Sequence, residues 1–137
     1  MSLSRGRTAR TTLAAAVVAA AVSASLPAAA SAAPVPANLV GNWKGDVTWP
    51  TGSHAVTLTI TSSRPVRGHI NVPGYCAGEW REVDRNAETV RVGFTRTSGI
   101  GCGTQNVWRL AFPREQGYIY GVSLTSRNDY IALSKAS

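Results

Sequence analysis

The feature that most constrains this chain is an alternation of apolar and polar residues with a period of two, which recurs from position 41 onward. No helical apolar pattern of any length interrupts it, and the alternating stretches are bounded by Gly, Pro, Asn or Ser. The pattern predicts eight strands, at about 41–49, 54–62, 66–72, 77–84, 88–96, 105–113, 117–124 and 128–134. Because short connections pair consecutive strands, and because closure removes exposed edges, we expect an all-β, eight-stranded antiparallel up-and-down barrel rather than a sandwich.

The first 32 residues have the character of a secretory leader. Arg5, Arg7 and Arg10 precede an apolar core at 13–22, and the small residues at 28–36 suit cleavage after Ala32. This core is well short of the roughly 20 residues that a membrane span needs. We therefore expect a signal peptide at 1–32, a short linker at 33–38 and a single domain at 39–137 that is secreted, extracellular and free of a membrane anchor.

Removal of the leader changes the charge of the protein. Three of the 14 Lys and Arg residues lie in the leader, which leaves 11 against seven Asp and Glu and a formal net charge of +4 instead of +7. So modest an excess on an exported domain argues against nucleic acid as a partner.

The two cysteines test the strand count. In a meander the odd-numbered connections lie at one end, and Cys76 and Cys102 fall in the third and the fifth. A count that was wrong by one would place them roughly a strand length apart, too far for a bridge. In an oxidising compartment we expect them to pair, which closes a loop of about 27 residues and stabilises the fold by roughly 3.5 kcal/mol.

The start of the domain carries a short motif. In "LVGNWKG" at 39–45, Trp43 follows Gly41 by two positions. This G-x-W motif resembles the start of lipocalin and avidin barrels, and the resemblance implies that Trp43 is a structural plug at one end of the barrel. Those families often back the Trp with an Arg from the last strand, and here Lys135 is the residue at that place.

A second resemblance covers nearly the whole mature chain. The segments "LVGNWKGDVTW", "AVTLTI", "GYCAGEW", "GIGCGTQNVWRL" and "GYIYGVSL" are similar to a group of small one-disulfide all-β domains of actinobacteria. These domains are secreted or lie on the cell surface, and they also occur as extracytoplasmic parts of some serine/threonine kinases. The resemblance implies a secreted, non-catalytic β domain.

Strand parity assigns side chains to the inside of the barrel. The inward set includes all four tryptophans and the apolar residues of the seventh strand: Trp43, Trp49, Trp80, Trp108, Tyr118, Tyr120, Val122 and Leu124. At the disulfide end, aromatic and polar residues combine as in a small-molecule or sugar pocket. The predicted ligand site there consists of Trp49, His54, Tyr75, Arg96 and Trp108. Eight strands enclose a space only just wide enough for side chains, so a solid core is the preferred alternative to a pocket.

The hairpin between the fourth and fifth strands raises two questions. Centred on Asn86, it pairs Glu82 with Val90 and directs the carboxylate into the apolar interior, so we expect a bulge that turns Glu82 outward. The same register sets Arg81 opposite Arg91. These two belong to an outward basic strip, Arg67, Arg81, Arg91 and Arg109. Neighbouring Glu79 can offset the positive charge of the strip. Alternatively, the strip binds an acidic partner such as an anionic cell-wall polymer.

The chain offers little for catalysis. His54 and His69 differ in their relation to the core, and no free cysteine or metal-ligand spacing remains, so we expect no enzyme, no cofactor and no metal. The expected function is a binding module that takes a small hydrophobic or sugar-like ligand at the barrel mouth. The alternative is a protein-interaction module, such as an inhibitor of an extracellular hydrolase, that acts through "TSGIGCGTQ" at 97–105.

Overall fold

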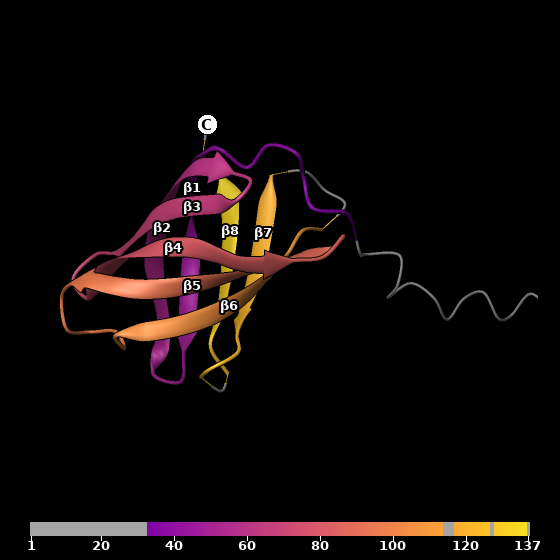
Figure 1. The fold of residues 1–137 in the computed structure, drawn as a ribbon. Helices are drawn as coiled ribbons and strands as arrows, with labels where there is room; N and C mark the ends of the chain where they lie inside the picture. The colour runs from indigo at the N-terminus through magenta and orange to yellow at the C-terminus, as the bar shows by residue number, and fades with distance from the viewer. Residues whose placement is uncertain (1–32, 114–116, 127, 137) are drawn as a thin grey trace, which may run out of the picture. The chain divides into compact units, whose positions relative to one another are not determined.

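The structure, a computed structural model, describes residues 33–113, 117–126 and 128–136, so the predicted leader lies outside the described residues. Eight strands run through this part of the chain: β1 (Gly41–Trp49), β2 (Gly52–Ser63), β3 (Val66–Val72), β4 (Cys76–Arg85), β5 (Thr89–Ser98), β6 (Gln105–Ala111), β7 (Tyr118–Ser123) and β8 (Tyr130–Lys135). They pair antiparallel in chain order and close as a barrel through β1 and β8 (Figure 1). The predicted fold class is confirmed. No helix in the described ranges is long and apolar enough to cross a membrane.

The two ends of the barrel are built differently. The closed end holds the segment 33–40 together with the turns at 64–65 and 86–88, and the mouth holds the turns at 50–51, 73–75 and 99–104. At the mouth Cys76 and Cys102 form a disulfide with a Cα–Cα distance of 5.8 Å. This confirms the predicted pairing and shows that the strand count between the two cysteines is right.

Trp43 lies in the core at the closed end. Its indole Nε1 donates to the carbonyl oxygen of Leu39 at 3.0 Å, and the Leu39 N–H donates to Ser63 Oγ at 2.7 Å. Lys135, at the end of β8, places its Nζ 5.5 Å from the Trp43 ring centroid and donates to the Val40 carbonyl at 3.0 Å. A lysine therefore covers this tryptophan as a cation–π partner.

Glu82 is also at the closed end, where it is largely buried. Its Oε1 accepts from the Val66 N–H at 3.0 Å and from Arg85 Nη2 at 2.6 Å, and the same Arg85 nitrogen donates to the Ser63 carbonyl at 2.6 Å. The expected bulge exists, but it follows Glu82 and turns Val83 outward instead, with 57% of Val83 exposed. The expectation that the bulge turns Glu82 outward was therefore wrong: Arg85 and the Val66 N–H satisfy its carboxylate where it is.

The predicted register of the β4–β5 hairpin was wrong. Asn86 begins the turn instead of lying at its centre, because its side-chain Oδ1 accepts from the N–H groups of Glu88 and Thr89, both at 2.8 Å. Arg81 consequently faces Gly93. Arg91 pairs with Asp84 in an ion pair, and Arg81 bonds to Glu79 at 3.4 Å. All four arginines of the basic strip are exposed on the outer wall, as parity predicted.

The faces predicted for the seventh strand were also wrong. Ile119 and Gly121 face the core, and the large residues lie outside. A Cβ on Gly121 would come 2.8 Å from Ile131 Cγ2 and 2.9 Å from Leu110 Cδ2, so the core has no room for a side chain there. The outer face of β7, its following segment and β8 instead carries an exposed apolar strip of Tyr118, Tyr120, Val122, Leu124 and Tyr130.

Candidate functional site

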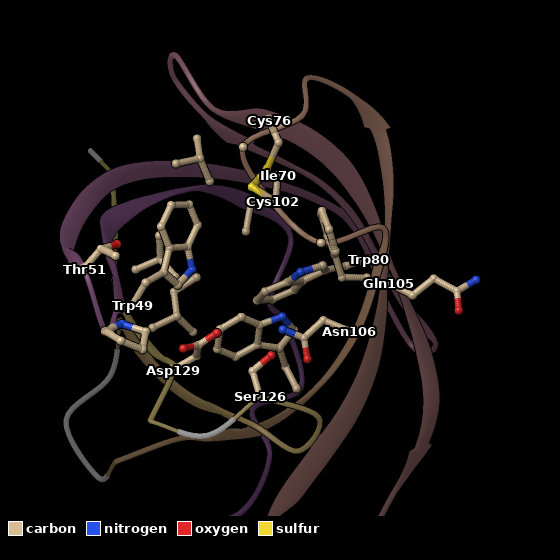
Figure 2. A pocket seen from close by; sticks show the side chains of 18 residues that line it. Trp49, Thr51, Ile70, Cys76, Trp80, Cys102, Gln105, Asn106, Ser126 and Asp129 are labelled. Atoms are coloured by element: carbon tan, nitrogen blue, oxygen red, sulfur yellow. A yellow bond between two sulfur atoms is a disulfide. The ribbon is translucent and has the colours of Figure 1, made fainter.

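A cavity of about 350 Å³ occupies the mouth half of the barrel (Figure 2). Three indoles line it, from Trp49, Trp80 and Trp108. The rest of its apolar wall comes from strand residues that face inward: Val47, Ile70, Val72, Phe94 and Ile131. The volume lies at the lower end of the range for small-molecule sites. The preferred expectation of a solid core was therefore wrong for this half of the barrel.

Strand pairing positions the aromatic wall. Trp80 on β4 lies opposite Phe94 on β5, and Val92 on β5 lies opposite Trp108 on β6, so parity brings these rings to the same interior. A Cβ on Gly78 would come 2.1 Å from Phe94 Cε2. The Phe94 ring therefore covers the backbone of Gly78, and this glycine keeps the ring in the wall.

One buried polar group among the lining residues belongs to Trp80. The residue is 1% exposed, and among the residues that the structure describes its Nε1 has no hydrogen-bond partner. An indole N–H is a donor only, and a buried donor without a partner costs about 1–3 kcal/mol. A bound molecule removes that cost only if its acceptor reaches this covered nitrogen.

Asn106, at the start of β6, contributes a second donor. Its Oδ1 accepts from Ser123 Oγ at 2.7 Å and also from Thr125 Oγ1. These two hydroxyl groups fix the orientation of the amide, so its Nδ2 is the polar group that Asn106 presents to the cavity (Figure 2).

Asp129 lies in the segment between β7 and β8 and brings a carboxylate to the same cavity (Figure 2). Burial raises the pKa of Asp129, and a hydrogen bond from Ser126 acts in the opposite direction. Its backbone carbonyl accepts from the Ser123 N–H at 3.0 Å, which holds the segment in place. The site thus combines one acidic group, the nitrogen donors of Trp80 and Asn106, and the polar side chains of Thr51, Gln105 and Ser126 with an aromatic wall.

The structure brings only part of the predicted site to the cavity. Trp49 and Trp108 line it. His54 and Tyr75 pack beside Trp49, with ring centroids 4.6 Å and 5.6 Å from that indole and 4.4 Å from each other. They contact Trp49 but are not among the residues that line the cavity. Within the described chain, His54 Nε2 is buried without a partner in this aromatic cluster.

Arg96 forms hydrogen bonds with the neighbouring loop. Its guanidinium Nη1 donates to the Cys102 carbonyl at 2.6 Å, and its backbone N–H donates to the Thr104 carbonyl at 2.9 Å. The residue is therefore engaged by the 99–104 connection, and it does not contribute to the lining of the cavity that the structure describes.

That connection presents one apolar side chain to the outside. Ile100 is 91% exposed. Gly99 has φ +77°, and a Cβ there would come 2.3 Å from the Tyr75 carbonyl oxygen, so glycine is required. The Gly101 N–H donates to the same oxygen at 2.9 Å. The disulfide and these contacts hold Ile100 at the tip of an ordered loop.

Sequence reasoning placed Asn106 at the mouth and Trp80 in the interior without assigning either to the ligand site, and it missed Asp129. Trp80 and Asn106 share the inward parity of their strands, so the signal was present. Asp129 and Ser126 lie in an irregular connection, where parity has no meaning. In the described residues no group of three His, Cys, Asp or Glu side chains is placed to hold a metal ion.

The fold and the site define an eight-stranded antiparallel barrel with an aromatic-walled cavity at one end. Comparison with protein-family models, with curated proteins and with solved structures gave no match. The chemistry of the cavity lining is therefore the main indication of function.

Proposed function

We propose that this protein is a secreted, non-catalytic binding module that takes a small apolar molecule into the cavity at its mouth. The observation that supports it most is a cavity of about 350 Å³ lined by three indoles, one of which, that of Trp80, has an Nε1 without a partner within the part of the chain that the structure describes. Apolar walls with a few fixed polar groups are typical of small-molecule sites. The disulfide is compatible with the extracellular location that the leader predicts.

The aromatic wall also provides the assay. Titration of the oxidised protein with a panel of lipophilic probes, sugars and wall fragments should change its tryptophan fluorescence saturably for at least one compound. Trp108→Ala should remove this response because it opens the cavity wall. Trp43→Phe, a matched change at the closed end, should keep it.

A folding check makes the assay decisive. Thermal unfolding of both variants, followed by circular dichroism, shows whether each remains folded at the assay temperature. If the folded wild-type protein responds to no compound in the panel, or if Trp108→Ala responds as the wild type does, the cavity is not a ligand site and the proposal fails.

One observation favours a second function, that of a protein-interaction module such as an inhibitor of an extracellular hydrolase. Ile100 is exposed at the tip of a loop held by the disulfide and by the Tyr75 carbonyl. An apolar side chain on an ordered loop costs little conformational entropy to bind. If this loop is the functional element, Ile100→Asp should abolish inhibition of a target peptidase or glycosidase while the response of the cavity is unchanged, and Ile100→Val should retain inhibition.

A further inference from the structure

The cavity lining holds two nitrogen groups that can only donate hydrogen bonds, beside the side chains of Thr51, Gln105 and Ser126, which can donate or accept, and these two donors limit what can bind. Trp80 Nε1 is a donor, and Asn106 presents the nitrogen of its amide because two hydroxyl groups already occupy its oxygen. A ligand must offer an acceptor to such groups to gain from them. A carbonyl oxygen has two lone pairs and can accept from one or both donors.

Charge supplies the second limit. Asp129 lines the same cavity, and the described residues of the lining include no Lys, Arg or His. A ligand carboxylate would therefore meet a like charge without a cation to offset it, in a place where burial already penalises ionised groups. The cavity is unsuited to the carboxylate of a fatty acid or an aromatic acid.

The wall supplies the third limit. Indoles from β1, β4 and β6 border the space, and indole faces pack well against ring systems. A compact cyclic molecule can contact several of them within about 350 Å³.

From these three limits we infer that the cavity binds an uncharged cyclic molecule that carries a hydrogen-bond acceptor of the carbonyl type, in preference to a plain hydrocarbon or a carboxylate of the same shape. This inference rests on the proposed function, because it names the ligand class of the same cavity. Trp80 is the specificity-determining donor, and Asp129 is the group that rejects anions.

Three probes of nearly equal size test it: 2-acetylnaphthalene, 2-ethylnaphthalene and 2-naphthoate, each titrated by calorimetry into the oxidised protein. The acetyl compound should bind about fivefold to tenfold more tightly than the ethyl compound, which is the worth of one hydrogen bond to a buried donor. The naphthoate should bind at least tenfold more weakly than the acetyl compound. Trp80→Phe should remove the preference for the acetyl group, Asp129→Asn should recover naphthoate binding, and Trp43→Phe should change neither.

A measurement on the wild-type protein keeps the test independent of how the variants fold. In spectra of ¹⁵N-labelled protein, the Trp80 Nε1–H resonance should move downfield with the acetyl compound and not with the ethyl compound, with the Trp43 resonance as internal reference. Equal affinity for the acetyl and ethyl compounds overturns the ligand class and leaves the proposed function standing. If naphthoate binds most tightly of the three, the ligand class is likewise overturned and the proposed function stands. The absence of binding by all three overturns the proposed function and this inference with it.

Discussion

The closed end and the mouth of this barrel treat their buried polar groups in opposite ways. At the closed end the Glu82 carboxylate has Arg85 and the Val66 N–H as partners, and the Trp43 indole donates to Leu39. In the mouth half, within the described chain, the indole N–H of Trp80 has none. Buried polar groups in folded proteins are nearly always partnered, so an exception needs an explanation. The comparison shows that the polar groups of the closed end stabilise the barrel, whereas the unpartnered indole N–H in the mouth half costs stability, which the proposed ligand would recover.

Removal of the Arg85 side chain should break the closed end most severely. Arg85→Met leaves the largely buried Glu82 carboxylate and the Ser63 carbonyl without their cation, and the loss of one partner from a buried ion pair costs about 3–5 kcal/mol. Urea unfolding at neutral pH measures the change. Arg91→Met, which breaks the exposed pair with Asp84, is the matched control and should have little effect. Equal losses from the two variants would show that the Glu82 pair is not a special element of the closed end.

Loss of the disulfide should weaken the fold less and should act on the mouth. The Cys76→Ser, Cys102→Ser double variant opens a loop with a sequence separation of 26, which should cost about 3.5 kcal/mol of unfolding free energy. Core amides that exchange only through global unfolding should lose protection by that amount throughout the barrel, including around Trp43 and Lys135. Amides at 73–76 and 99–104 should lose more than their share through local opening of the mouth, and equal changes at both ends would contradict this local effect.

Replacement of a valine by phenylalanine at the two ends of β3 should affect stability and binding differently. Val66 is fully buried at the closed end, so Val66→Phe should overpack the core and cost about 2 kcal/mol. Val72 lines the cavity, so Val72→Phe should fill empty space, leave the stability nearly unchanged and abolish binding of 2-acetylnaphthalene. Thermal unfolding and calorimetry measure the two effects. A Val72→Phe variant that binds normally would mean that the cavity is not where the ligand sits.

The smallest effect concerns pH: protonation of Glu82 should lower the unfolding free energy, whereas protonation of Asp129 should raise it. Hydrogen bonds from Arg85 hold the pKa of Glu82 below its ordinary value, so its contribution to stability is present above that ordinary value and is lost as the pH falls through the lowered one. Burial raises the pKa of Asp129, so the folded protein takes up this proton before the unfolded chain does, and acidification favours the folded state at this group. Unfolding free energies measured across the acid range should therefore fall less steeply for Glu82→Gln than for the wild type, and more steeply for Asp129→Asn. Parallel curves for all three proteins would contradict both assignments.

The accuracy of prediction from sequence also differed between regions of regular and irregular structure. Alternation placed the strands, and parity placed Trp80 and Trp108 in the interior, because a strand fixes the side of every residue. Parity could not show that Arg96 bonds to the Cys102 carbonyl, or that Asp129 reaches the cavity from a connection without a repeating geometry.

The seventh strand shows a second reason for error. Its outer face carries Tyr118, Tyr120 and Val122, while its inner face carries Ile119 and Gly121. Hydrophobicity alone favours the face with the two tyrosines and the valine as the inner one, which is wrong. The inner face instead has a glycine at position 121, because the close approach of Leu110 and Ile131 leaves no room for a side chain. The packing that decides this is tertiary and cannot be seen in the strand itself.

Closure of the barrel brings the first and last strands together. Because the number of strands is even, these two are antiparallel, and the start of β1 lies beside the end of β8, with Trp43 opposite Lys135. Both points at which the barrel joins the rest of a polypeptide therefore lie at the closed end. A fusion partner, an affinity tag or a solid support attached through either point would leave the mouth facing away from the attachment. Immobilisation by either terminus is thus a suitable format for ligand screening, and any neighbouring domain in a longer chain would join at the end opposite the cavity.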